Sequence, residues 1–226
     1  MCPEARADVV LEFDHLNSRR VAVRSSFCDE DGSHRSYAGV FESFLNIDAT
    51  QLFDAVDRCW QSSKTARAHA YAKKNASTSA HPGEFAVVVQ ELVYATVSGT
   101  CLSKHPITGD EALIYVEAVL GMGESQAAGL VTPDYYVLHK SNLDVTEQRV
   151  VPQRRKLVPS LDSAAGLEWV DVPEPVATAP KLSSELLAEI GRTILRLEQT
   201  LRHSCGLEWA SDDVGLRVLQ CRAMTS

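Results

Sequence analysis

The sequence contains no long apolar run and no block of basic residues, and each of these absences excludes a class of protein. No apolar run approaches the roughly 20 residues of a membrane span, and the N-terminus, MCPEARADVV, lacks a basic region followed by an apolar one. Lys and Arg together number 22 and Asp and Glu 30, so the net charge is −8. This charge argues against nucleic acid or an anionic membrane as the main partner. We therefore expect a cytoplasmic protein.

The six cysteines and seven histidines are scattered along the chain. No C-x-x-C or H-x-x-x-H spacing is present, so neither a zinc site nor a disulfide framework is expected. Reduced, mostly buried thiols are the expected state, and we assign no histidine to a metal. A length of 226 residues with 45% hydrophobic content is sufficient for a sizeable core, in one large domain or two small ones.

The stretch 206–226, GLEWASDDVGLRVLQCRAMTS, has the pattern of a β-hairpin. Two aspartates and a glycine at 212, 213 and 215 supply turn chemistry between two short apolar-rich runs. The first run covers 206–210 and the second 216–222. Two antiparallel strands are therefore predicted.

The register of this hairpin predicts which polar side chains meet. A period of two in the second strand puts Val218, Gln220 and Arg222 on one face. With the turn centred near Val214, Glu208 lies opposite Gln220, and the Cβ atoms of such cross-strand partners are about 5 Å apart. A carboxylate and an amide oxygen at that spacing suit one hard cation, and Arg222 suits a phosphate beside it. The alternative is an exposed hairpin whose polar residues form no site.

Hydrophobic patterning predicts four further strands. They are expected at 21–26, 97–102 and 112–118, and at the near-continuous apolar run 85–93. We expect the run 85–93 to be a central strand that is covered on both faces. The strands at 97–102 and 112–118 are expected to be its neighbours.

Two helices are predicted, one in each half of the chain. The first begins near Thr50, is capped by Asp48 and continues toward Lys73. The second begins at Ser183 or the next serine, after an irregular surface connection at 160–180. Their apolar stripes indicate core packing by Leu52, Val56, Cys59 and Trp60 in the first helix and by Leu187, Ile190, Ile194, Leu197 and Leu201 in the second.

A series of short motifs carries a resemblance to a known family. They are VAVRSS at 21–26, SYAGVFESFLN at 36–46, AVVVQ at 86–90, HPITG at 105–109, GMGE at 121–124, GLVTPDYY at 129–136, GLEWA at 206–210 and LQCRA at 219–223. In this order they resemble the ATP-binding domain of the pyruvate phosphate dikinase, phosphoenolpyruvate synthase and rifampicin phosphotransferase family. The resemblance extends from about Val21 to the last residue.

The resemblance implies an α+β fold of the ATP-grasp type, mostly antiparallel sheet with flanking helices, that holds ATP and Mg²⁺. Glu208 and Gln220 are implied to hold the magnesium of the nucleotide, and Arg24 and Arg222 to contact its phosphates and stabilise the transferred charge. A loop that includes Gly39 is implied to cover the phosphates. Gln90 is a candidate for contact with the base. A structural hydrogen bond inside the sheet is an equal alternative for Gln90.

Three departures from the family pattern concern activity and domain organisation. Val40 stands where Gln is common, and Gly206 stands where Asp is usual, which removes one carboxylate from beside the magnesium. Only residues 1–20, with a weak strand candidate at 9–13, precede the first motif, where a further subdomain is expected. We therefore expect 21–226 to be a partial ATP-binding domain with its first subdomain largely missing, and 1–20 to stay unassigned.

The function expected from these patterns is ATP-dependent phosphotransfer of the dikinase type. The phosphoryl group of Mg–ATP would pass to a histidine on a partner chain or to a small molecule. A separate chain would supply the missing subdomain or the phosphohistidine domain. One alternative is a non-catalytic homologue that binds a partner or a nucleotide without turnover. Another is an ATP-driven condensing enzyme of secondary metabolism, like the synthetases of tripyrrole pigments.

Overall fold

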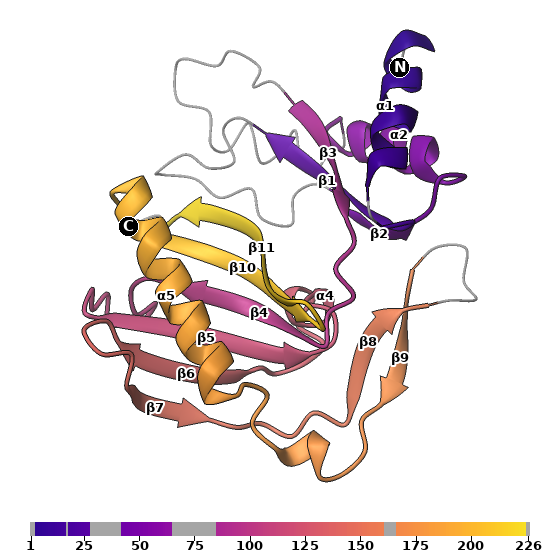
Figure 1. The fold of residues 1–226 in the computed structure, drawn as a ribbon. Coiled ribbons are helices and arrows are strands. Elements are labelled where there is room, and N and C mark those ends of the chain that lie inside the picture. The colour runs from indigo at the N-terminus through magenta and orange to yellow at the C-terminus, as the bar shows by residue number, and fades with distance from the viewer. Residues whose placement is uncertain (1–2, 17, 28–41, 65–84, 161–165, 225–226) are drawn as a thin grey trace. The chain divides into compact units, whose positions relative to one another are not determined.

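The computed structural model describes most of the chain, as two compact units (Figure 1). Unit 1 consists of the described residues in Met1–Leu92 and Pro159–Leu167, and unit 2 of those in Val93–Val158 and Glu168–Ser226. The predicted loop residues Gly39 and Val40 lie outside the described residues. The described stretches are 3–16, 18–27, 42–64, 85–160 and 166–224.

Unit 1 contains a three-stranded antiparallel sheet with the strand order β2–β1–β3. β1 confirms the strand predicted at 21–26. One face of the sheet packs on helix α2, because the alternating residues Val21 and Val23 of β1 share a buried cluster with Leu52 and Cys59 of the helix. The elements of this unit are α1 (Pro3–His15), β1 (Val21–Phe27), β2 (Phe44–Ile47), α2 (Leu52–Ser62) and β3 (Phe85–Glu91).

Helix α2 differs from its prediction in both its start and its packing. It begins two residues after the predicted start at Thr50, because the Asp48 carboxylate accepts from the backbone N–H groups of Thr50 (3.0 Å) and Gln51 (3.2 Å) in a turn that precedes the helix. The predicted continuation from residue 65 lies outside the described residues. Trp60, predicted as core, is 46% exposed and packs edge-on against the ring of Phe85.

The prediction of a central strand at 85–93 was wrong. β3 is the edge strand of the described three-stranded sheet, and its side chains alternate between half-buried and exposed, with Val88 exposed. A short apolar run does not distinguish a central strand from an edge strand, because periodicity carries no information on pairing partners. The strands predicted to flank it belong to unit 2, and the weak strand candidate at 9–13 lies within α1.

Unit 2 is built on a six-stranded sheet with the order β11–β10–β4–β5–β6–β7, in which every pairing is antiparallel. Helix α5 covers one face of this sheet (Figure 1). The elements are β4 (Val97–Leu102), β5 (Leu113–Leu120), α4 (Glu124–Ala127), β6 (Asp134–His139), β7 (Val145–Arg149), β8 (Arg155–Pro159), β9 (Leu167–Asp171), η1 (Val176–Thr178), α5 (Ser184–Leu201), β10 (Cys205–Asp212) and β11 (Gly215–Ala223).

Helix α5 confirms its sequence prediction. Ser183 is its N-cap, and the hydroxyl of Ser183 accepts from the backbone N–H of Leu186 at 3.2 Å. Its apolar stripe packs on the sheet through Leu187, Ile190 and Ile194, which are buried. Leu201, predicted as core, is 40% exposed at the last turn of the helix, so that part of the prediction was wrong. The connection predicted to be irregular at 160–180 contains strand β9, which pairs with β8. Among the described helices, none has both the length and the apolar character that a membrane crossing requires.

Candidate functional site

The turn between β10 and β11 is held by a single carboxylate. Asp212 Oδ1 accepts from the backbone N–H groups of Val214 (2.9 Å) and Gly215 (3.0 Å), and Gly215 has a φ of 136°. Burial alone would raise the pKa of Asp212, but these hydrogen bonds and the nearby Arg217 outweigh it and lower that pKa. Asp212 pairs with Gly215, so the turn itself consists of Asp213 and Val214.

A β-bulge at Leu219 sets the register that matters for the candidate site. Regular pairing from the turn runs through Trp209 and Val218, and its continuation would place Leu219 opposite Glu208. The register shifts between Glu208 and Trp209, so that Leu219 is passed over and Gln220 lies directly opposite Glu208. The predicted Glu208–Gln220 pair is therefore confirmed. The predicted alignment of Val218 with Gln220 was wrong, because Val218 pairs with Trp209 on the other side of the bulge.

A row of polar residues crosses the sheet of unit 2 at this level. Gln220 lies opposite Glu208, Glu208 opposite Thr100, and Thr100 opposite Glu117. Directly paired residues of an antiparallel sheet point to the same face, so these four side chains share one face. Their chain neighbours Leu207, Cys101 and Val116 lie in the core beneath α5. The polar row therefore occupies the face opposite to α5.

The carboxylate of Glu117 is the most closely bonded group of this row. Its Oε2 accepts from Gln126 Nε2 of α4 (2.6 Å) and from Thr100 Oγ1 (3.2 Å), and its Oε1 accepts from the Tyr115 hydroxyl (3.2 Å). Burial, followed by the charge of Glu117, raises the pKa of Tyr115 to about 12, so its phenol stays protonated and donates at neutral pH. These bonds hold α4 against the polar face.

Arg222 continues the same face one step along β11. It lies directly opposite Gly206, two residues beyond the Glu208–Gln220 pair on each strand. A Cβ atom built on Gly206 would lie 3.1 Å from Cδ2 of Leu102, the far end of a flexible side chain. The structure therefore brings the predicted residues Glu208, Gln220 and Arg222 together on one face. Their role as ligands stays a prediction.

The predicted residues of unit 1 also share a face. Arg24 of β1 pairs with Val88, and Gln90 of β3 pairs with Ala22, so Arg24 and Gln90 lie on the face opposite to the α2 core. Such diagonal neighbours in adjacent strands have Cα atoms about 7–8 Å apart, within reach of a long side chain. Gly39, the third predicted residue of this unit, lies outside the described residues.

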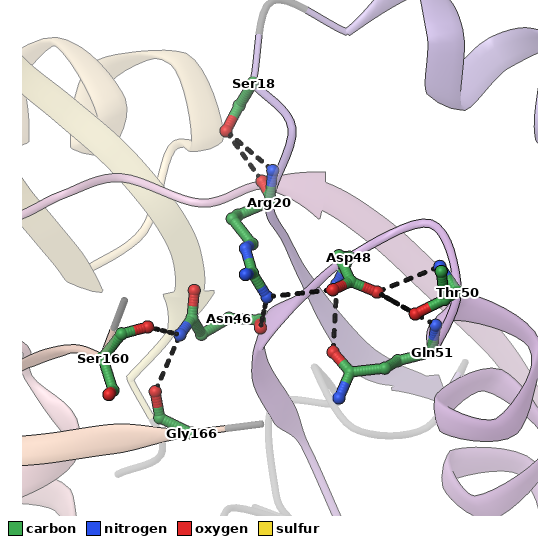
Figure 2. Close-up of polar contacts among 8 residues, drawn as sticks. All are labelled: Ser18, Arg20, Asn46, Asp48, Thr50, Gln51, Ser160 and Gly166. Atoms are coloured by element: carbon green, nitrogen blue, oxygen red, sulfur yellow. Dashed lines mark hydrogen bonds and ion pairs between the residues drawn. The ribbon is translucent and has the colours of Figure 1, made fainter. Parts of the chain in front are cut away.

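A polar network in unit 1 fixes the ends of several elements around β2 (Figure 2). Arg20 Nη1 lies 3.3 Å from Asp48 Oδ2 and donates to the carbonyl oxygen of Asn46 at 3.1 Å. The buried amide of Asn46 donates from Nδ2 to the carbonyl oxygens of Ser160 (2.9 Å) and Gly166 (2.8 Å). The side chain of Asn46 therefore ties the backbone at Ser160 and at Gly166, both in unit 1, to β2 (Figure 2).

Sequence reasoning missed three of these polar residues. Glu117 interrupts the apolar run of β5, and a charged residue within such a run is a signal for a specific partner. Thr100 follows the Ser-Gly pair of β4, where the alternation of the strand assigns it to the same face as Glu208. Asn46 has a φ of 62°, a conformation that asparagine adopts more readily than most residues.

The chemistry of the polar row suits a hard cation bound beside a phosphate. The row offers a carboxylate, an amide oxygen and a hydroxyl oxygen, with an arginine on the same face, and oxygen donors are what Mg²⁺ prefers. In the described part of the chain, no group of three His, Cys, Asp or Glu residues is placed to hold a metal by itself. Magnesium bound through one or two carboxylates usually completes its shell with phosphate oxygens and water, so the donor set fits a metal–nucleotide complex.

Comparison with known proteins agrees with this arrangement. Residues 2–226 match the family model of the pyruvate phosphate dikinase AMP/ATP-binding domain, a domain of the ATP-grasp type. The chain is 32% identical over 217 residues to a phosphoenolpyruvate synthase of Aeropyrum pernix, a match that covers 85% of this chain and 26% of the relative. It is 31% identical over 209 residues to the uncharacterized phosphotransferase YvkC of Bacillus subtilis, covering 92% of this chain and 24% of the relative.

The name of a third relative indicates a different activity. The chain is 30% identical over 207 residues to the prodigiosin synthesizing transferase PigC of Serratia marcescens, which covers 91% of this chain and 23% of the relative. The chain thus spans about a quarter of the length of each of these three relatives. It belongs to the family of the pyruvate phosphate dikinase AMP/ATP-binding domain.

Proposed function

We propose that this chain is the nucleotide-binding part of an ATP-dependent phosphotransferase of the dikinase and phosphoenolpyruvate synthase type. The observation that supports this most directly is the pairing of Glu208 with Gln220, with Arg222 on the same face of the sheet. Residues 21–226 would form part of the ATP-binding domain. A cytoplasmic location agrees with the use of ATP.

In this proposal, the predicted site residues of unit 2 have two tasks, to hold magnesium and to bind phosphate. Glu208 and Gln220 hold the magnesium of the nucleotide through a carboxylate and an amide oxygen. When bound, the magnesium would neutralise charge on the phosphates. Arg222 presents a permanently charged guanidinium to the phosphate oxygens, and its planar donors suit a bidentate contact. These residues lie on strands, which keeps their spacing constant during a reaction.

Arg24 and Gln90 of unit 1 supply the remaining contacts of the proposal. Arg24 is proposed to bind phosphate and to stabilise transferred charge, the same task that is proposed for Arg222. Gln90 shares the face of Arg24, and its amide suits hydrogen bonds to the base. Gly39, in the loop that would cover the phosphates, completes the set.

The acceptor of the phosphoryl group is proposed to be a histidine on a partner chain or a small molecule. The names of two relatives, a phosphoenolpyruvate synthase and a phosphotransferase, favour this class of reaction. A separate chain that carries a phosphohistidine domain is the partner proposed for this transfer.

Two other functions are each favoured by a specific observation. Gly206 removes a carboxylate that the family usually has beside the metal, which favours a non-catalytic homologue that binds nucleotide without turnover. The name of PigC, a prodigiosin synthesizing transferase, favours an ATP-driven condensing enzyme of secondary metabolism.

Phosphorus NMR of the purified chain with ATP and MgCl₂ tests for turnover, with imidazole as a soluble substitute for an acceptor histidine. A phosphotransferase is expected to convert the ATP signals into those of ADP or AMP, and Glu208→Gln should slow this conversion. Nucleotide binding without any conversion would contradict phosphotransfer by this chain and favour the non-catalytic homologue.

A further inference from the structure

We propose that Thr100 is a third oxygen ligand for the cation held by Glu208 and Gln220, and that Glu117 positions its hydroxyl group. This inference rests on the proposed function, since it concerns the same cation. Thr100 would touch the cation directly, whereas Glu117 would act through Thr100.

The position of Thr100 in the sheet is the first argument. Thr100 lies directly opposite Glu208 on one side and directly opposite Glu117 on the other. The Cβ atoms of such pairs are about 4.5–5.5 Å apart, and all three side chains project from the same face. Gln220 extends the row beyond Glu208. Thr100 therefore lies between Glu208 and Glu117 in the row, and Glu208 belongs to the proposed site.

The direction of the hydroxyl proton is the second argument. An ionised carboxylate only accepts hydrogen bonds, so the contact of 3.2 Å between Thr100 Oγ1 and Glu117 Oε2 has threonine as its donor. A hydroxyl has a single proton, and here that proton is used by Glu117. The oxygen of Thr100 can then offer only lone pairs to any other neighbour, which is what a cation requires.

The hydrogen bonds that hold the carboxylate of Glu117 are the third argument. Gln126 and Tyr115 both donate to its carboxylate, at 2.6 and 3.2 Å. Gln126 also donates to the hydroxyl oxygen of Thr100 at 3.4 Å, which leaves the second lone pair of that oxygen for the cation. A carboxylate fixed by donors from α4 and from its own strand has little freedom to rotate. It therefore holds the threonine proton in one direction. This is how an outer residue orients a metal ligand.

The charge of Glu117 adds to this effect. Glu117 is two strands away from Glu208, about 10 Å between Cα atoms, on the same face of the sheet. Its negative charge raises the attraction of this face for a cation. Glu117 thereby partly replaces the carboxylate that is missing at position 206.

The test is a magnesium titration of the binding of AMP-PNP, a non-hydrolysable ATP analogue, by calorimetry. Thr100→Val keeps the shape of the side chain and suits a strand, but it removes the hydroxyl oxygen. Glu117→Gln also keeps the shape, but an amide can donate as well as accept, so it no longer forces Thr100 to act as the donor. Both should raise the magnesium concentration for half-maximal binding by about 10- to 100-fold. Thr100→Ser retains the hydroxyl and should stay within about threefold of the wild type.

Glu147→Gln is the matched control, because Glu147 also accepts from a tyrosine hydroxyl on this sheet, that of Tyr135. It should leave the magnesium requirement unchanged. AMP-PNP binding measured in EDTA is the second readout, since a general defect in folding would weaken it as well. Only the magnesium-dependent binding should change in Thr100→Val and Glu117→Gln.

Two outcomes separate this inference from the proposed function. If Glu208→Ala abolishes magnesium-dependent binding while Thr100→Val titrates like the wild type, the inference is wrong and the proposed function stands. If the wild-type chain shows no magnesium-dependent binding of AMP-PNP, the proposed function fails, and the inference fails with it.

Discussion

Glu208 lies directly opposite Gln220 because Leu219 forms a bulge between the turn and this pair. Without the bulge, regular pairing from the two-residue turn would place Leu219 opposite Glu208, and Gln220 would lie one position farther along the strand. Bulges often occur where a strand must present a particular side chain. The bulge thus turns an ordinary hairpin into one that presents a carboxylate, an amide and, through Arg222, a guanidinium on one face.

Restoring a carboxylate at position 206 should strengthen magnesium-dependent nucleotide binding. Gly206→Asp adds a further acid on the face of Glu208, and the Cβ atom meets only the flexible end of Leu102. We expect the magnesium concentration for half-maximal AMP-PNP binding to fall by about tenfold, as typical changes around a metal site do. Gly206→Asn, similar in size but uncharged, is the control. An equal effect of both variants would contradict the role assigned to charge.

Asn46 should contribute measurably to the stability of unit 1. Asn46→Gly keeps the positive φ but removes two hydrogen bonds, to Ser160 and Gly166, and should lower the free energy of unfolding by about 2 kcal/mol. Asn46→Ala should cost about 1 kcal/mol more, because alanine resists that backbone conformation. Urea denaturation measures both. Equal stability of the glycine variant and the wild type would show that the bonds do not contribute.

The buried ion pair of Asp134 and Lys181 should be sensitive to the loss of either partner. Lys181 Nζ lies 2.5 Å from Asp134 Oδ1, and both side chains are at most 1% exposed. Lys181→Met leaves a buried carboxylate without its counter-charge and should cost about 3–5 kcal/mol in the free energy of unfolding. The double variant with Asp134→Asn should recover part of this loss, because no buried charge remains. Recovery is only partial, because both carboxylate oxygens of Asp134 accept from backbone N–H groups, of Val151 and Lys181, and an amide NH2 cannot accept.

The exposed pair of Arg154 and Glu174 is the control for that experiment. Its side chains are 69% and 49% exposed, so Arg154→Met should cost about 0–1 kcal/mol. A loss for Lys181→Met no larger than this would contradict the account of the buried pair. Chemical denaturation of the variants compares them directly.

The chain should become less stable at alkaline pH, because burial raises the pKa of its thiols. Burial, and then neighbouring Cys221, raises the pKa of Cys205 to about 12, and burial raises that of Cys59 to about 11, against an ordinary value of 9.0. Between these values the unfolded chain loses thiol protons that the folded chain keeps. The free energy of unfolding is thus unaffected by these thiols below about pH 9 and decreases above it, by at most about 1.4 kcal/mol per pH unit for each thiol.

Urea denaturation between pH 8 and pH 11 measures this slope. Cys205→Ala should have a shallower slope than the wild type, whatever its stability at pH 8. Lysine residues titrate in the same range, so the difference between the two slopes is the informative quantity. Identical slopes would contradict the raised thiol pKa.

Local signals in the sequence predicted the elements that depend on local chemistry. Helix α5 begins after its predicted cap, Ser183, and the hairpin of β10 and β11 forms where its turn residues placed it. The pair of Glu208 and Gln220 was predicted with a turn centred on Val214. The structure reaches the same pair through a two-residue turn and the bulge at Leu219, which no turn signal reports.

Features that depend on long-range pairing were not predicted. The run at 85–93 has the composition of a central strand, but β3 is an edge strand in its described sheet, and β4 and β5 pair in a different one. Which strands pair is decided by contacts between residues far apart in the sequence, which a local pattern does not contain. For the same reason the contacts of Thr100 with Glu117 and of Asn46 with Gly166 appear only in the structure.

The binding of AMP-PNP in the presence and absence of magnesium, measured by calorimetry, tests the central claim most directly. The wild-type chain should bind in a magnesium-dependent manner, and Glu208→Ala should weaken that binding by about 100-fold. Glu189→Ala removes an exposed carboxylate from α5, which covers the opposite face of the sheet, and should bind like the wild type. Magnesium-dependent binding of equal strength in Glu208→Ala and the wild type would contradict the account.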